Sequence, residues 1–211
     1  MLEQRIKTLI SDINFIELAK YIMLETHIKT NNDEYRIIEM ELYICNDKHK
    51  DIFTHQHSMQ KTMLNWYFHQ MSEKSGSYKG GTFKGLDISC GFDEGYGGIL
   101  IRAVLNESTN QVIEGPCNVV NELLKSTKSQ SISDFVSKSN ANISCINNDL
   151  LKLEEKKFID ESIYVAPRIG LSLKGDNIEE KKQYVDRKYR YIIFKDKIKK
   201  EKKKLELYKK D

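Results

Sequence analysis

The stretch Arg-Ile-Ile-Glu-Met-Glu-Leu-Tyr, residues 36 to 43, decides the fold. Its alternating side chains predict a short β-strand with two different faces. One face would hold Ile38, Met40 and Leu42, and the other Ile37, Glu39, Glu41 and Tyr43. Ionised carboxylates are almost never buried without partners. The second face therefore lies either against water or in a polar site where a carboxylate has a chemical role.

Length and composition favour one folded domain. The chain has 211 residues, of which 39% are hydrophobic and 31% charged, with a net charge of +3. These values exclude the class of disordered proteins. We expect a single domain over residues 1–194 and a lysine-rich tail over residues 195–211. The tail has nine lysines and four acidic residues, a charge of +5 that leaves about −2 for the rest.

Nothing in the sequence indicates a membrane or secreted protein. The longest apolar stretch, residues 15–24, is interrupted by Glu17 and Lys20, and the first residues lack the apolar run of a signal peptide. The four cysteines form no Cys-x-x-Cys pair, so we predict free thiols. We expect a soluble intracellular protein of the nucleus or cytoplasm, without membrane contact.

Other segments carry the patterns of helices and strands. Asn14 followed by Glu17 predicts the start of a helix that runs to about residue 25. Gly115-Pro116 predicts the start of another. Further strands are predicted at residues 99–105, 163–165, 171–173 and 189–194, and a mobile insertion at 126–148. Together these patterns predict an α+β fold, in which helices flank a curved, largely antiparallel β-sheet.

Arg102 interrupts the apolar strand at 99–105. A guanidinium cannot lose its proton, so a buried arginine needs a carboxylate or phosphate partner. Glu39 and Glu41 are the best candidates. Taken alone, such a pair is typical of a structural ion pair.

The succession of these motifs resembles the alkyladenine (3-methyladenine, methylpurine) DNA glycosylases. Residues 14–24 and 35–43 are similar to that family's Leu-Ala-Arg-x-Leu-Leu helix and Ile-Val-Glu-x-Glu-Ala-Tyr strand. Further matches are Gly-Ile-Leu-Ile-Arg-Ala-Val at 98–104, Gly-Pro at 115–116, Pro-Arg-Ile-Gly at 167–170 and Tyr-Arg-Tyr at 189–191. The matches keep their order over residues 14 to 192. The resemblance implies that family's fold and its activity.

The resemblance also implies roles for individual residues. Glu41 would deprotonate the water that attacks the sugar of a flipped base, assisted by Arg102 and the backbone carbonyl of Ile169. Tyr43 would stack on the base, with His55, or His57 in its place, on the opposite side. This chemistry needs an oriented water, a general base and flat surfaces around the base.

Some positions depart from the family pattern. Ser77-Tyr-Lys-Gly-Gly-Thr-Phe-Lys-Gly85 replaces an aromatic-rich hairpin that opens the duplex, and Tyr78 or Phe83 could substitute for its aromatic residues. Asp87 replaces an asparagine that contacts the base, which leaves only hydrogen-bond acceptors there. We assign contacts with nucleic acid to Tyr78, Lys79, Lys84 and Arg168.

The leading hypothesis is a monofunctional DNA glycosylase that hydrolyses the N-glycosidic bond of an alkylated or deaminated purine in base excision repair. The alternative is a non-catalytic module that keeps the fold and binds nucleic acid or a ribonucleoprotein. His55, His57 and His69 could ligate zinc with Glu39 or Glu41, but their spacing matches no common zinc pattern. We therefore predict no metal and no cofactor, with DNA as the partner of a monomer.

Overall fold

A computed structural model describes residues 2–159, 161–200 and 205–209. Its central strand is β2 (Glu34–Asn46), which confirms the strand predicted at residues 36–43. It pairs antiparallel with β6 (Tyr96–Asn106) on one side and β10 (Arg190–Ile192) on the other. The strands predicted at 99–105 and 189–194 are confirmed by these two neighbours.

The pairing of β2 with β6 is irregular at two residues. Ile38 has no partner between the pairs Ile37–Val104 and Glu39–Ala103, and Arg102 has none before the pair Met40–Ile101. An extra residue of this kind turns the neighbouring side chains. The predicted strict alternation is therefore broken at Ile38, which is fully buried like Ile37.

All strand pairs of the described residues are antiparallel, and their main path runs β11-β9-β10-β2-β6-β5-β4. The remaining strands are β1 (Thr26–Thr30), β3 (His49–Lys50), β4 (Met63–Phe68), β5 (Leu86–Cys90), β7 (Val112–Glu114), β8 (Leu151–Glu155), β9 (Tyr164–Ala166) and β11 (Glu206–Leu207). The antiparallel sheet confirms the predicted α+β class. The strand predicted at 171–173 is absent from this described segment.

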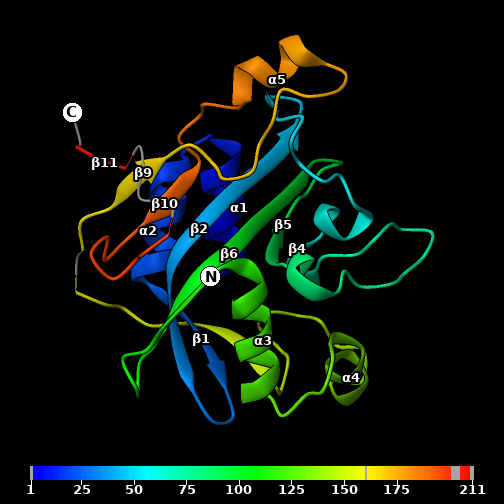
Figure 1. The fold of residues 1–211 in the computed structure, drawn as a ribbon, viewed down its shortest axis with the longest axis vertical. Coiled ribbons are helices and arrows are strands. Elements are labelled where there is room, and N and C mark those ends of the chain that lie inside the picture. The colour runs from blue at the N-terminus through cyan, green and yellow to red at the C-terminus, as the bar shows by residue number, and fades with distance from the viewer. Residues whose placement is uncertain (1, 160, 201–204, 210–211) are drawn as a thin grey trace.

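Among the described helices, all but the last in the chain pack on the sheet in two groups, while the last, which has no buried residue, lies apart from the sheet (Figure 1). The helices are α1 (Leu2–Ser11), α2 (Phe15–Leu24), α3 (Pro116–Ser126), α4 (Ile132–Lys138) and α5 (Ile178–Tyr184), with short 3-10 turns at Ser58–Lys61 and Gly81–Phe83. The side chain of Asn14 accepts from the Glu17 N–H, so the predicted start of α2 is confirmed. Pro116 occupies the first turn of α3, as predicted.

Residues 126–148, predicted as a mobile insertion, include helix α4 and contribute side chains to the core. Ser131 caps α4, and its hydroxyl accepts from the Asp134 N–H. Phe135 and Cys145 from this segment are buried in the core. A seven-residue helix is too short to show a clear period among so many Ser and Asn residues.

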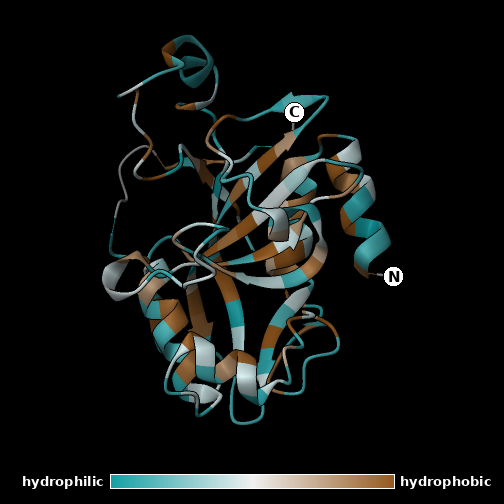
Figure 2. Ribbon diagram, turned by 90° about the vertical axis from the view of Figure 1, so that its right-hand side faces the viewer, coloured by the Kyte–Doolittle hydropathy of each residue, from teal (hydrophilic) through white to brown (hydrophobic). Residues whose placement is uncertain are grey.

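The hydrophobic core lies along the strands and the helices packed on them, where apolar residues concentrate, while polar residues dominate the outer loops (Figure 2).

In the described part of the chain, no helix has the length and apolar character needed to cross a membrane. Of the predicted lysine-rich tail, residues 201–204 and 210–211 lie outside the described residues.

Candidate functional site

A row of polar side chains crosses the sheet on one face. The strand register places Tyr67 opposite Asp87, Asp87 opposite Leu100, Leu100 opposite Glu41, and Glu41 opposite Arg190. Directly opposed residues share a face of the sheet. Four separate strands thus bring a tyrosine, two carboxylates and an arginine into one row.

Glu41 is completely buried. Its Oε2 accepts a hydrogen bond from the Tyr43 hydroxyl at 2.8 Å, and its Oε1 accepts one from the backbone N–H of Ile169 at 2.8 Å. Burial raises the pKa of Glu41, while the positive charge of Arg102 opposes this rise. A carboxyl group with a raised pKa is suited to proton transfer nearer to neutral pH.

Arg102 bridges the two glutamates of β2. Its Nε donates to Glu39 Oε1 at 3.0 Å, and its Nη1 lies 3.4 Å from Glu41 Oε1. Glu39 also accepts from Arg190 Nε at 2.7 Å. Burial lowers the pKa of Arg102, but the charges of Glu41 and Glu39 raise it more. Both predicted partners of Arg102 are therefore in place, and Glu39 accepts hydrogen bonds from two arginines.

Ile169 contacts Glu41 through a different atom from the one that the resemblance implied. The backbone N–H of Ile169 faces Glu41, whereas the implied water would use the carbonyl of the same residue. The preceding Arg168 is 5% exposed and forms a buried pair with Asp51. Its guanidinium lies 4.5 Å from the centre of the Tyr43 ring. The predicted contact of Arg168 with nucleic acid is therefore wrong, because the guanidinium is enclosed and supports Tyr43.

Three histidines gather around Tyr67 and Asp87. His55 Nδ1 lies 2.8 Å from the Tyr67 hydroxyl, and His69 Nε2 lies 2.8 Å from Asp87 Oδ1. His57 stacks on Tyr67 with ring centres 4.9 Å apart. The sequence analysis grouped the three histidines as possible zinc ligands with Glu39 or Glu41, whereas the structure places them around Tyr67 and Asp87.

Gln60 completes this cluster and was not predicted. Its side-chain amide donates to Asp87 Oδ2 at 3.1 Å, so both oxygens of Asp87 are held. Gly98 lies beside this hydrogen bond, since a Cβ there would come within 2.5 Å of Asp87 Oδ2. A glycine inside a predicted strand is the sequence signal that could have indicated such a close approach.

An open cleft of about 540 Å³ borders the row. Its lining includes His69, Phe83, Lys84, Leu100, Cys117 and Lys200. Leu100 is the row member between Asp87 and Glu41, and Phe83 is 77% exposed. A second open cleft, of about 690 Å³, is lined in part by Tyr78, Lys79, Lys84 and Lys125. Lys84 is shared by both clefts, and Tyr78 packs edge-on against the buried Phe68.

Comparison with known proteins adds one relative. No protein-family model matches the chain. An uncharacterized protein of Acanthamoeba polyphaga mimivirus is 34% identical over 208 residues, which cover 91% of this chain and 93% of the mimivirus protein. This similarity covers about nine tenths of each protein, so the chain belongs to the same protein family as the mimivirus protein.

Proposed function

We propose that the protein is a purine-specific DNA N-glycosylase, with Glu41 as its general base. One observation supports the proposal most strongly. Tyr43, Arg102 and the Ile169 backbone all contact the carboxylate of Glu41, which is buried. Breaking an N-glycosidic bond by water needs a base whose position is fixed and whose field stabilises a cationic sugar. The ordered resemblance to alkyladenine DNA glycosylases supports the same assignment.

Access to Glu41 would pass along Arg102. The Arg102 side chain is 13% exposed, whereas that of Glu41 is completely enclosed. In the proposed reaction, Tyr43 yields its hydrogen bond on Glu41 Oε2 to the attacking water. Arg102 then keeps the carboxylate ionised, because a positive charge beside a carboxylate favours its charged form.

The cleft next to Leu100 is the proposed site of the extruded base. His69 lines it as a hydrogen-bonding group and contacts the buried Asp87, which Gln60 also holds. Phe83 is exposed beside the cleft, where an apolar ring could fill the space that the base leaves in the duplex. Lys79, Lys84 and Lys125 line the adjoining cleft, in which ammonium groups could meet phosphates.

A single-turnover assay tests this proposal. Duplex and single-stranded oligonucleotides, each with one alkylated or deaminated purine, are incubated with excess protein and the free base is quantified. Glu41→Gln should abolish release while it leaves oligonucleotide binding intact. Glu122→Gln is the matched control, because Glu122 also accepts from a tyrosine hydroxyl, that of Tyr35, away from the polar row.

One observation favours a second function, a non-catalytic module that binds nucleic acid. Arg102 is bound to Glu39 as well as to Glu41, and Glu41 has no exposed surface, as expected of a purely structural network. In that case the oligonucleotides would bind, no base would be released, and Glu41→Gln would change only stability.

A further inference from the structure

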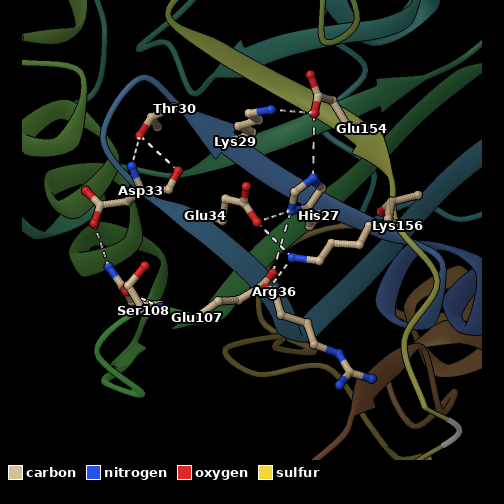
Figure 3. A network of polar contacts seen from close by, with 12 residues as sticks. His27, Lys29, Thr30, Asp33, Glu34, Arg36, Glu107, Ser108, Glu154 and Lys156 are labelled. Atoms are coloured by element: carbon tan, nitrogen blue, oxygen red, sulfur yellow. Dashed lines mark hydrogen bonds and ion pairs between the residues drawn. The ribbon is translucent and has the colours of Figure 1, made fainter.

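A second polar cluster lies at one corner of the sheet, apart from the polar row (Figure 3). His27 of β1 faces Glu34, the first residue of β2, and Glu107, in the turn after β6. One ligand atom from each of these three residues lies within 4.8 Å of the other two. Strands β1 and β2 and the turn after β6 thus direct a nitrogen and two carboxylate oxygens at one point.

Two of the three atoms that face this point lack hydrogen-bond partners. His27 is 4% exposed, and its Nδ1 is buried without a hydrogen bond, as is Glu107 Oε1. His27 Nδ1 lies 3.5 Å from Glu34 Oε2 and 3.6 Å from Glu107 Oε1, too far for a normal hydrogen bond. Unpaired buried polar atoms cost free energy, so two of them facing one point indicate a missing partner.

The separations fit a bound metal ion better than direct contacts. Two ligand atoms at about 2.1 Å from a tetrahedral ion lie roughly 3.4 Å apart. The separations from His27 Nδ1 to the two carboxylate oxygens, 3.5 and 3.6 Å, are close to this value. We propose that His27, Glu34 and Glu107 bind a divalent transition-metal ion, with Zn²⁺ as the preferred species.

The donor set decides the type of ion. An imidazole nitrogen with two carboxylates suits zinc and similar metals, whereas Mg²⁺ and Ca²⁺ prefer oxygen ligands alone. Glu154 of β8 is directly opposite His27 in the strand register, and its Oε2 lies 3.7 Å from His27 Nε2. A carboxylate on the far ring nitrogen is the usual partner that orients a metal-binding histidine. At 3.7 Å the two atoms are not hydrogen-bonded, and we assign Glu154 as the residue that would orient His27 once the ion binds.

Lys156 competes with the proposed ion. Its ammonium donates to Glu34 Oε2 at 2.7 Å and to Glu107 Oε2 at 2.6 Å. Binding of the ion would take Glu34 Oε2 from Lys156, while Glu107 Oε2 could keep its hydrogen bond to the ammonium. The ion would then join β1, β2 and the β6–β7 turn, as a structural metal does.

Calorimetric titration of Zn²⁺ into the metal-stripped full chain tests the site, with Mg²⁺ and Ca²⁺ titrated in parallel. We expect one saturable Zn²⁺ site, no comparable binding of Mg²⁺ or Ca²⁺, and a higher melting temperature with Zn²⁺. His27→Gln and Glu107→Gln should each abolish this binding. Glu154→Gln should weaken it about 10- to 100-fold, the usual range for a supporting residue.

Two further variants make the test specific. His49→Gln removes another buried histidine, on β3, and should keep wild-type affinity. Lys156→Met removes the competing ammonium and should tighten Zn²⁺ binding about tenfold, because a nearby positive charge repels the ion. Absence of a saturable site, or wild-type affinity in folded Glu107→Gln protein, would overturn the proposal. Equal affinity for Mg²⁺ would overturn the assignment to a transition metal.

Discussion

At the scale of single residues, the buried carboxylate of Glu41 governs the expected pH dependence. Burial raises its pKa above the ordinary glutamate value of about 4.3. A general base acts in its deprotonated form, so base release should be complete above this raised pKa and be lost as pH falls through it. Single-turnover rates between pH 4 and 9 measure this directly. A rate that stays constant down to about pH 4 would contradict the role of Glu41.

The buried pair of Arg168 and Asp51 is the second prediction at this scale. Both side chains are fully enclosed, and Arg168 Nη1 also donates to the Leu42 carbonyl at 2.9 Å. Arg168→Met leaves Asp51 buried without its partner, which should lower the free energy of unfolding by about 3–5 kcal/mol. Urea denaturation measures the loss. Lys61→Met, which removes a surface pair with Glu94, is the control and should leave stability unchanged.

Some residue contacts could be predicted and others could not. The pairing of Arg102 with Glu39 and Glu41 follows from a lone arginine in an apolar strand, since that charge must be neutralised. The contact of Arg168 with Asp51 joins two irregular segments and has no periodic signal. The same holds for His27, Glu34 and Glu107, which are separated along the chain and meet only through strand pairing.

At the scale of elements, strand β6 depends on glycine where it passes under the Asp87 cluster. A Cβ at Gly98 would meet Asp87 Oδ2 at 2.5 Å and Gln60 Nε2 at 2.6 Å. Gly98→Ala should therefore displace Asp87, cost about 1–3 kcal/mol of stability and change which purine is preferred. Thermal unfolding and the ratio of release rates for two damaged purines check this.

The control for this change is Gly80→Ala. A Cβ at Gly80 meets no atom within 4 Å, and its φ of −103° suits any residue. Gly80→Ala should therefore leave stability unchanged. If both substitutions lowered stability equally, the contact of Gly98 with Asp87 would not be the cause of the loss.

The sequence predicted the helices and strands that have a clear cap or a regular apolar pattern, and it missed strands that lack both. Helix α2 has an Asn14 cap and an apolar period, and strand β2 alternates between apolar and charged residues from Ile38 to Leu42. Strand β4 was missed because Leu64 has a φ of +52° and the pairing with β5 shifts between Met63 and Trp66. A local departure of this kind disturbs the period that predicts a strand.

At the scale of the whole molecule, the order of the strands in the sheet could not be predicted from the sequence. Strands β9 and β10 come from the last third of the chain, yet β10 pairs with β2 and places Arg190 beside Glu39 (Figure 1). Such pairings depend on the packing of the complete chain. The α+β class was predictable because it needs only the types of elements and their succession.

Charge around the clefts leads to a prediction about nucleic-acid affinity. Lys79 and Lys84 line the clefts beside the polar row. Replacing both with glutamine should weaken duplex binding and reduce the slope of log affinity against log salt by about 2. Fluorescence anisotropy at several salt concentrations measures the slope. Lys182→Gln on α5, at the opposite end of the molecule from α3 and α4, is the control and should not change it.

The release of a free purine base in single turnover, compared between wild-type and Glu41→Gln protein, tests the central claim most directly. The proposed mechanism predicts release by the wild-type protein and at least about a 100-fold lower rate for Glu41→Gln, with oligonucleotide affinity unchanged. Equal rates for the two proteins would contradict the role of Glu41. Binding without any release by the wild-type protein would contradict the glycosylase activity itself.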